Sequence, residues 1–561
     1  MNVLEIKDLT FTYPGAVAPT LNHVDLNIEK GDFIAIVGNN GCGKSTLCKV
    51  MNGLIPHFIT GEFDGTVLAG GFDTQTVEIG DLAKIVGYVY QDFENQIVRP
   101  TVLDDASYAC MNYAMPDYLE RGRLALKNCG LEGKDDEYIW QLSGGQTHLL
   151  ALAGAVSLEP EVLILDEPIA QLDPRHADLI YGILKDLNER LGKTIIVIEH
   201  HTEYIADYCK HVVLLKEGHV EWMLPTKDAL DQVETLQASN IFPPQVTLAA
   251  YHLREQGKLD RDLVLPSTIL DGKKVFRELA FAEPKIQEKK SHGKDVSVSF
   301  RNVSVSYRTV KGEPKKIYKQ LNLDLHKGEK IALIGSNGAG KSTMMKLMTG
   351  LVKPNEGEIY IKSLAVHETK PEKVSKYVSM VYQNPEDMFI KDSIEADIAY
   401  AMQVRNVEDW KENTDALLER FRLTNLKDRD GRLLSGGQMR RASLAIGVAL
   451  CPEILLLDEP TANLDIATRK EIMKTLKDME DITDTVMIAT HDMQLVSEWA
   501  ERIIVLYQGH VLADGSRNEI FGNKEVVEKV GIRPPDIFTM GKELHKDAFC
   551  YTVDEFLQSF V

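Results

Sequence analysis

The chain has 561 residues, enough for several domains, and its 44% hydrophobic and 26% charged content is that of an ordinary globular protein. Its net charge of −21 argues against non-specific nucleic-acid binding, and its seven scattered cysteines form no C-x-x-C pair of a zinc site or disulfide framework. The absence of an apolar run of roughly 18 residues and of a signal-peptide pattern leads us to expect a cytosolic protein without a membrane span.

The first predicted element, residues 3–13, has the partial alternation of an antiparallel strand and ends in Tyr13. Residues 298–307 repeat the pattern and end in Tyr307. Each tyrosine precedes a glycine-rich loop, where its ring could stack on an adenine or could be a half-buried strand residue. The spacing alone leaves both interpretations open.

A glycine-rich loop follows an apolar run in each half, and a helix is predicted after it. Residues 38–45 and 335–342 fit G-x-x-x-x-G-K-[ST], the P-loop, in the strand–loop–helix context that the motif requires. The glycines let backbone N–H groups surround a phosphate, and the helix N-terminus adds partial positive charge. A plain glycine-rich turn would not need this context. The residues predicted to bind the nucleotide here are Gly38, Asn39, Asn40, Gly41, Cys42, Gly43, Lys44, Ser45, Thr46, Gly335, Ser336, Asn337, Gly338, Ala339, Gly340, Lys341, Ser342 and Thr343.

Cys42 lies inside the first of these loops. A helix N-terminus can lower the pKa of a thiol, which predicts that alkylation of Cys42 blocks turnover and that bound ATP protects. The alternative, a passive spacer, remains open.

A glutamine ends the next apolar strand in each half, Gln91 after residues 85–90 and Gln383 after residues 378–382. A neutral amide at this position can touch both Mg²⁺ and water. A surface glutamine is the alternative, but the matched spacing in the two halves favours a functional role.

The same five residues, Leu-Ser-Gly-Gly-Gln, begin an apolar helix in each half. The serine can cap the helix, and the glycines let an anion approach its N-terminus. Gln91 and Ser143 are 52 positions apart, as are Gln383 and Ser435. A simple helix cap does not explain this repetition, so we predict a ligand-binding role for Ser143, Gly144, Gly145, Gln146, Ser435, Gly436, Gly437 and Gln438.

A continuous apolar run, typical of a buried parallel strand, ends in an Asp-Glu pair in each half. The aspartate is predicted to hold Mg²⁺ and the glutamate to polarise the attacking water. Turns are predicted at 171–173 and 463–465, and a further buried strand then ends in a histidine that can bond the γ-phosphate. The predicted metal ligands are Ser45, Gln91, Asp166, Ser342, Gln383 and Asp458, and the predicted catalytic residues are Glu167, Glu459, His200, His491, Gln91 and Gln383.

The repeated motif spacings and the matching tails at 241–244 and 532–535 indicate an internal repeat. Residues 283–293 are polar and lack apolar periodicity, as expected of a linker. The predicted organisation is a first domain with a C-terminal extension at 1–257, a linker at 258–295 and a second such domain at 296–561.

This set of motifs resembles the ATP-binding-cassette (ABC) ATPases over essentially the whole of both halves, and the Leu-Ser-Gly-Gly-Gln signature is highly specific to that family. The resemblance implies an α/β fold of two tandem P-loop NTPase domains, each with an antiparallel β subdomain, a helical signature subdomain and a small C-terminal extension. It implies ATP hydrolysis with Mg²⁺, with closure on ATP as the power stroke. Tyr13 and Tyr307 match the family's adenine-stacking position.

The resemblance also implies that each ATP lies between the P-loop of one cassette and the signature of the other. One site would pair Lys44, Gln91, Asp166, Glu167 and His200 with Ser435 and Gly437, and the second would pair Lys341, Gln383, Asp458, Glu459 and His491 with Ser143 and Gly145. After the signature, residues 439–441 are Met-Arg-Arg, basic as is usual in the family, whereas residues 147–149 are Thr-His-Leu. We therefore expect unequal sites, with the Lys341 site the weaker.

Within the family, the chain is most similar to the energy-coupling-factor importers of vitamins and metal ions. Their glutamine is followed by an acidic, Asn/Gln-rich turn, as in residues 91–105, and residues 383–394 are similar but have Met388 in place of Gln96. This resemblance implies a fused ATPase pair, peripheral on the cytoplasmic face of the membrane and present once per complex. Its partners would be an integral-membrane scaffold (T) subunit and a substrate-binding (S) subunit, with no nucleic acid, and the substrate would be selected by the S subunit.

Two other ABC classes remain alternatives. Translation factors of the F subfamily, which act on ribosomes, also have tandem cassettes, but they usually carry Asn-His-Leu-Asp after the second carboxylate and a long basic linker. This chain has Ala-Gln-Leu-Asp at 170–173, Ala-Asn-Leu-Asp at 462–465 and a linker of mixed charge. Ribosome binding at a net charge of −21 would need a concentrated basic patch. Tandem sugar-importer ATPases typically lose, in their second cassette, motifs that this chain retains.

Overall fold

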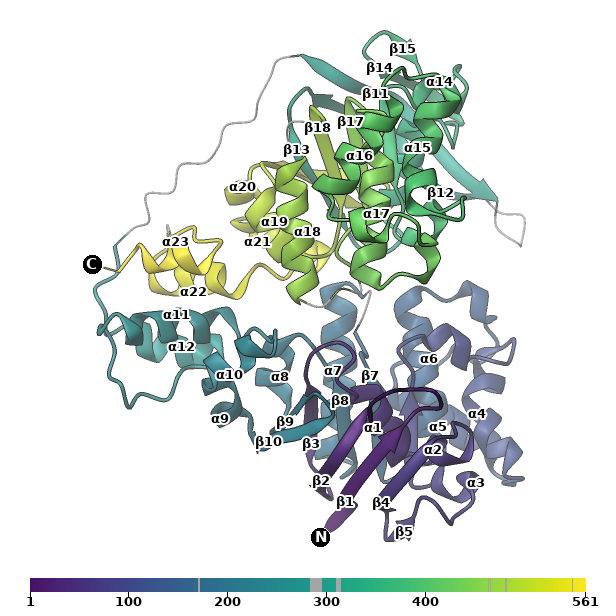
Figure 1. The fold of residues 1–561 in the computed structure, drawn as a ribbon, viewed down its shortest axis with the longest axis vertical. Helices are drawn as coiled ribbons and strands as arrows, with labels where there is room; N and C mark the ends of the chain where they lie inside the picture. The colour runs from purple at the N-terminus through teal and green to yellow at the C-terminus, as the bar shows by residue number, and fades with distance from the viewer. Residues whose placement is uncertain are drawn as a thin grey trace. The chain divides into compact units, whose positions relative to one another are not determined.

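The computed structural model forms two compact units, which are described separately (Figure 1). The first contains Met1–Glu283, Thr539–Ala548 and Val553–Val561, and the second contains Pro284–Phe538 and Phe549–Thr552. The structure describes residues 1–169, 172–282, 295–308, 314–462, 464, 466–479, 482–546 and 548–560. The predicted linker segment 283–293 and, of the two predicted turns, residues 171, 463 and 465 therefore lie outside the described residues.

The first unit opens with an antiparallel sheet in the order β2-β1-β4-β5. Alternate residues of its long strands are buried, which confirms the antiparallel strand predicted at 3–13. The strands are β1 (Asn2–Thr12), β2 (Leu21–Glu29), β4 (Glu62–Ala69) and β5 (Phe72–Asp73).

A six-stranded sheet in the order β10-β9-β3-β8-β7-β6 forms the centre of the unit, and all its neighbouring strands are parallel except β9 and β10. Strand β3 is buried on both faces, because its odd-numbered residues pack into a core with the helices and its even-numbered residues into a core with the antiparallel sheet. The strands are β3 (Phe33–Val37), β6 (Val86–Val89), β7 (Val162–Asp166), β8 (Thr194–Ile198), β9 (His211–Lys216) and β10 (His219–Pro225).

Helices connect these strands and cover the central sheet, and α4, α5 and α6 pack against one another (Figure 1). The helices are α1 (Lys44–Met51), α2 (Leu54–His57), α3 (Ile79–Leu82), α4 (Val102–Asn112), α5 (Tyr118–Asn128), α6 (Gly144–Val156), α7 (Pro174–Glu189), α8 (Thr202–Tyr208), α9 (Thr226–Asp231) and α10 (Val233–Ala238), with 3-10 turns at Phe93–Gln96 and Ile139–Gln141.

The second unit repeats this architecture, with sheets in the orders β12-β11-β14-β15 and β16-β17-β18-β13-β19-β20. Its strands are β11 (Val296–Arg308), β12 (Pro314–His326), β13 (Lys330–Gly335), β14 (Glu356–Ile361), β15 (Leu364–Ala365), β16 (Val378–Val381), β17 (Ile454–Asp458), β18 (Thr485–Ala489), β19 (Arg502–Tyr507) and β20 (His510–Gly515). Its helices are α13 (Lys341–Met348), α14 (Pro371–Val374), α15 (Ile394–Val404), α16 (Trp410–Arg420), α17 (Gly436–Val448), α18 (Ile466–Asp478), α19 (Met493–Trp499), α20 (Arg517–Phe521) and α21 (Lys524–Val530), with 3-10 turns at Pro385–Met388, Thr424–Leu426 and Gly431–Leu433. The two units thus have the predicted α/β class with antiparallel and helical parts.

The C-terminal segments divide differently from the predicted domain boundaries. The range predicted as linker, 258–295, contains α12 (Ile269–Phe276), which packs with α11 (Gln245–Glu255) in the first unit. The chain's last helices, α22 (Asp536–Leu544) and α23 (Val553–Leu557), contribute to the same unit. The Phe276 ring lies 5.2 Å from that of Phe556. None of the described helices is long and apolar enough to span a membrane.

Candidate active sites

The predicted site residues of the first unit meet at one edge of its central sheet. Strands β6, β7, β8 and β3 are parallel neighbours, so their carboxyl ends lie together. The P-loop, Gln91, the Asp166–Glu167 pair and His200 all follow those ends. Ligands of open α/β sheets bind at this edge. The second unit has the same arrangement.

The two P-loops are built alike. Lys44 is 7% exposed, and its Nζ donates to the carbonyl oxygens of Gly38 at 2.8 Å and Asn39 at 2.9 Å. In the second unit, Lys341 Nζ donates to the Gly335 carbonyl at 2.8 Å. A Cβ on Gly38, which has a φ of 155°, would lie 2.2 Å from a backbone oxygen, so the loop requires glycine there. Each loop therefore holds an ammonium group at the helix N-terminus, where a phosphate can bind.

The oxygen ligands that Mg²⁺ prefers lie beside each P-loop. Ser45 hydrogen-bonds Asp166, and Ser342 hydrogen-bonds Asp458 in the same way. Burial raises the pKa of both aspartates. Among the described residues, no group of three or more His, Cys, Asp or Glu side chains could hold a metal. The hydroxyl and carboxylate pair supplies two oxygen ligands of the kind that Mg²⁺ prefers.

Glu167 has both of its predicted neighbours beside it. Gln91 Nε2 donates to Glu167 Oε2 at 2.8 Å, and His200 Nε2 lies 3.2 Å from Glu167 Oε1. The backbone of Glu167 has a φ of 51°, and that of Glu459 has 46°, conformations that cost free energy for a residue with a side chain. This strain occurs at the residue predicted to polarise the water in both units.

The second unit arranges the corresponding residues differently. His491 Nε2 lies 2.8 Å from Lys341 Nζ and 3.6 Å from Glu459 Oε1. Burial raises the pKa of Glu459 to about 7, although the nearby Lys341 ammonium opposes the shift. Among the described residues, no hydrogen bond joins the Gln383 side chain to Glu459, in contrast to Gln91 and Glu167.

The predicted adenine-stacking tyrosines lie beside the P-loop helices. Tyr13 Oη lies 3.1 Å from Thr46 Oγ1, and Tyr307 Oη lies 3.5 Å from Thr343 Oγ1. The signature residues begin α6 and α17, as predicted. Within each of these helices, the glutamine accepts a hydrogen bond from the backbone N–H of the serine that precedes it by three residues.

The residues that follow the two signatures differ between the units. They therefore make different contacts with the segments around Gln91 and Gln383, the glutamine loops. In the second unit, the buried Arg440 donates to the carbonyl oxygens of Tyr382 at 3.0 Å and Gln383 at 2.7 Å. In the first unit, the matching residue His148 packs against the Phe93 ring. The guanidinium thus joins the signature helix to the glutamine loop by hydrogen bonds, whereas the imidazole does so by ring packing.

The buried His148 predicts a dependence of stability on pH. It is 4% exposed, and burial lowers its pKa from 6.5 to about 3, so the folded state keeps it neutral where the unfolded chain binds a proton. Stability should therefore fall as the pH drops below 6.5, and the loss between pH 7.5 and 5.5 should be about 1 kcal/mol larger in the wild type than in His148→Leu. Hydrogen exchange of α6 measures this difference. Equal losses in the two proteins would contradict it.

The structure corrects the predicted pKa of the Cys42 thiol. Burial raises the pKa of the Cys42 thiol, the reverse of the lowering predicted from the helix N-terminus, because the side chain is only 6% exposed. The positive charge of the nearby Lys44 opposes this rise in the pKa but does not reverse it.

His201, which had no predicted role, has its Nδ1 2.8 Å from the buried Glu199 carboxylate.

The contacts of Tyr88 and Arg440 were not predicted from the sequence. Tyr88 reads as an apolar strand residue, yet its hydroxyl donates to Asp166 Oδ2 at 3.2 Å. Arg440 was noted only as a basic residue of the family pattern. The signal that could have found both is the difference between halves, because Met380 and His148 occupy the matching positions.

Comparison with known sequences identifies the family to which the chain is similar. The sequence model of the ABC transporter family matches residues 21–170 and 318–462. A relative from Methanosarcina acetivorans is 31% identical over 562 residues, covering 97% of this chain and 90% of its own length. A relative from Caldanaerobacter subterraneus subsp. tengcongensis is 30% identical over 556 residues, covering 96% of each chain. Both are described only generically, as ABC transporter ATP-binding proteins.

Solved structures match single units of the chain. CbiO1 from Clostridium perfringens, described as part of the ABC transporter complex cbiONQ, is 30% identical and covers 46% of this chain and 99% of its own, with a TM-score of 0.39. A dimeric ATP-binding cassette bound to ADP and phosphate is 28% identical and covers 39% of this chain and 98% of its own, with a TM-score of 0.36.

Proposed function

The chain belongs to the ABC transporter family of ATPases, which use ATP with Mg²⁺, and we propose that it powers a membrane importer of the energy-coupling-factor type. In this proposal, it lies peripherally on the cytoplasmic face of the membrane and serves an integral-membrane scaffold (T) subunit and a substrate-binding (S) subunit. Its cargo would be a vitamin or a metal ion that the S subunit selects.

We further propose that each ATP lies between the P-loop of one cassette and the signature of the other. Lys44 would neutralise the β- and γ-phosphates, Ser45 and Asp166 would hold Mg²⁺, and Glu167 would polarise the attacking water. The serine and glycines of the opposite signature, Ser435 and Gly437, would close over the γ-phosphate. In the second site, the second half would supply the P-loop and carboxylates, and the first half would supply the signature. Closure on ATP and opening after hydrolysis would move the membrane subunits.

The segment after each glutamine carries the importer proposal. Val98 is 60% exposed, and its counterpart Ile390 is 61% exposed. A cation lies over a tyrosine ring next to each of them: the Arg99 guanidinium is 4.6 Å from the ring centre of Tyr108, and Lys391 with Tyr400 repeats the pair at 4.3 Å.

Buried carboxylates fix the backbone of these segments. Asp105 accepts hydrogen bonds from the backbone N–H groups of Val98 and Arg99, and Asp397 holds Ile390 and Lys391 likewise. Both units therefore present one exposed apolar side chain, on a hydrogen-bonded backbone, next to a cation. We infer that this position, repeated in both units, is where the membrane partner docks.

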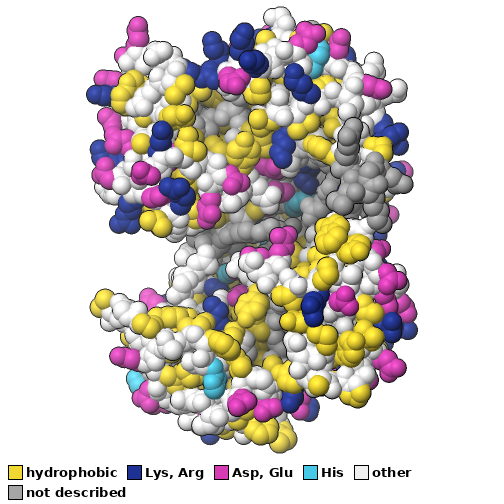
Figure 2. Space-filling model, turned by 90° about the vertical axis from the view of Figure 1, so that its right-hand side faces the viewer, with side chains coloured by type: hydrophobic (Ala, Val, Ile, Leu, Met, Phe, Trp, Pro, Cys, Tyr) yellow, Lys and Arg dark blue, Asp and Glu magenta, His cyan; other side chains and the backbone are white. Residues whose placement is uncertain are grey.

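A tagged pull-down from gently solubilised cells, with mass spectrometry of the partners, tests the proposal. Recovery of one or two small polytopic membrane proteins is the expected result. Ribosomal proteins in their place, or no membrane partner, would overturn the importer proposal and leave the ATPase. The face drawn in Figure 2 mixes acidic, basic and hydrophobic side chains, whereas ribosome binding would need concentrated positive charge.

The docking position gives a sharper prediction. Val98→Asp together with Ile390→Asp should reduce recovery of the membrane partner at least about tenfold, since two buried charges would each cost more than about 1.4 kcal/mol. ATP turnover of the isolated chain should persist. Val264→Asp is the matched control, because Val264 is a valine of similar exposure, 57%, outside both segments. Unchanged recovery in the double variant, or equal loss in the control, would reject these segments as the docking position.

A further inference from the structure

We propose that Tyr88 is a positioning residue of the first nucleotide site, where its hydroxyl orients the carboxylate of Asp166 toward Mg²⁺. Tyr88 lies on β6 and Asp166 ends the neighbouring parallel strand β7. The Tyr88 hydroxyl donates to Asp166 Oδ2 at 3.2 Å. The proposal rests on the magnesium role of Asp166 stated above.

The surroundings of Tyr88 keep it a donor. Its ring is half-buried, with the Tyr90 ring 4.8 Å away. A carboxylate can only accept a hydrogen bond, so the Tyr88 hydroxyl is the donor in this contact. Asp166 accepts from Tyr88 and from Ser45, so two hydroxyl groups orient its buried carboxylate.

The second unit lacks this hydroxyl. Met380 occupies the matching position on β16 and is 7% exposed. Its neighbour on β17, Asp458, keeps the hydrogen bond to Ser342. The two aspartates thus have the same P-loop partner but differ in the strand partner, which makes the second unit a natural comparison for the first.

Outer hydrogen bonds of this kind orient ligating carboxylates, and their removal typically lowers metal affinity by 10-fold or more. Tyr88→Phe should therefore weaken Mn²⁺ binding at the first site by about tenfold. The affinity for nucleotide without metal should stay unchanged, since among the described residues the Tyr88 hydroxyl bonds only the Asp166 carboxylate. A merely structural role of the ring would lower both affinities together.

The experiment uses the full chain with Lys341→Ala, which weakens nucleotide binding at the second site. Mn²⁺ and a non-hydrolysable ATP analogue are titrated, bound Mn²⁺ is read by electron paramagnetic resonance, and analogue binding is repeated in EDTA. Tyr90→Phe is the matched control, because it removes a hydroxyl from the adjacent, 41% exposed ring. We expect the Mn²⁺ constant to change about tenfold in Tyr88→Phe and less than twofold in Tyr90→Phe.

Two outcomes would overturn the proposal. A Mn²⁺ constant in Tyr88→Phe within twofold of the parent would show that the hydroxyl does not position the carboxylate. Equal loss of affinity with and without metal would assign Tyr88 a structural role only. Asp166→Asn in the same assay separates these results from a failure of the premise: if it binds Mn²⁺ like the parent, then Asp166 is not a metal ligand.

Discussion

Glu167→Gln should remove most of the ATP turnover of the full chain, about tenfold or more, whereas Glu459→Gln should remove less than about half of it. Glutamine keeps the shape of the side chain but cannot accept a proton from water, so each variant silences one site. The asymmetry follows from the signatures, because the Lys341 site would use the first signature, after which Thr-His-Leu replaces the basic residues.

The structure adds a second reason for unequal sites. Glu167 accepts the Gln91 amide at 2.8 Å, while Glu459 has a pKa raised by burial to about 7. A carboxyl group that is protonated below pH 7 cannot accept a proton, so the residual turnover of Glu167→Gln should rise as the pH increases from 6 to 8.

Phosphate release over that pH range measures both effects, with the double glutamine variant as the baseline and nucleotide affinity as the check on folding. Equal losses in the two single variants would reject the inequality. Residual turnover of Glu167→Gln that does not change with pH would show that the protonation of Glu459 is not limiting.

Much of the fold and of the sites followed from the sequence, because their chemistry is local. A P-loop is a continuous run whose backbone makes the site, and the Asp-Glu pair sits directly at the end of a strand pattern. The structure places Lys44, Gln91 and Glu167 at one sheet edge because parallel strands share that edge, and the family resemblance had implied this grouping.

The inequality of the two sites was predicted from the residues after the signatures, but the contacts that distinguish the sites could not be. They depend on side chains that meet across strands or between helix and loop, such as Tyr88 with Asp166 and Arg440 with the Gln383 carbonyl. No periodicity marks these contacts, because register and rotamer decide them. The matching Pro-Pro tails could be found in the sequence. The sequence did not predict that α12 and α23 belong to one compact unit.

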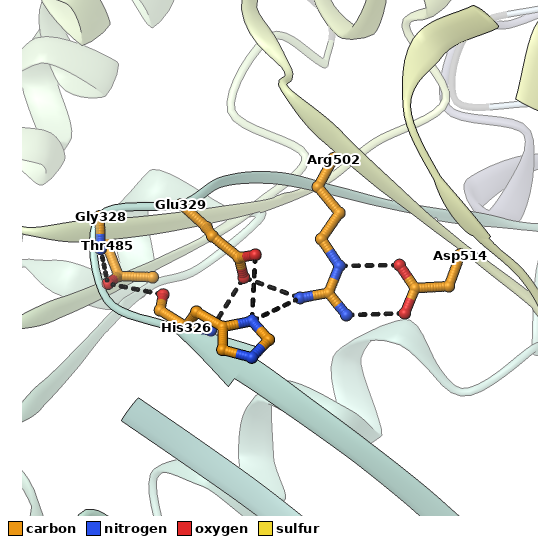
Figure 3. A network of polar contacts seen from close by, with 6 residues as sticks. All are labelled: His326, Gly328, Glu329, Thr485, Arg502 and Asp514. Atoms are coloured by element: carbon orange, nitrogen blue, oxygen red, sulfur yellow. Dashed lines mark hydrogen bonds and ion pairs between the residues drawn. The ribbon is translucent and has the colours of Figure 1, made fainter. Parts of the chain in front are cut away.

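The second large effect concerns stability rather than turnover. Figure 3 shows Arg502 between two carboxylates in the second unit. Its Nη1 donates to Glu329 Oε2 at 2.8 Å, and its Nε and Nη2 donate to Asp514, each at 2.7 Å. Glu329 is 1% exposed and also accepts the His326 backbone N–H at 2.8 Å. This network ties the end of β12 to the start of β19, at the sheet edge away from the P-loop.

Arg502→Met should destabilise the second unit by about 3 kcal/mol or more, because it removes the guanidinium from the buried Glu329 carboxylate. Asp514→Asn should cost less than about 1 kcal/mol, since Asp514 is the more exposed partner and the asparagine oxygen can still accept one of the two hydrogen bonds from Arg502. The double variant Arg502→Met with Glu329→Met should recover most of the loss, because it removes the buried carboxylate together with the guanidinium and leaves only the more exposed Asp514 without its partner.

Hydrogen exchange resolved by peptide measures these changes in β13 and β19, and peptides from β3 and β9 of the first unit are the internal control. Arg502→Lys, which places an ammonium group at this position, should retain part of the stability but lose the two-pronged contact with Asp514. If Arg502→Met and Asp514→Asn cost the same, the buried carboxylate is not what the guanidinium compensates. If the double variant is as unstable as Arg502→Met, the loss comes from packing and not from charge.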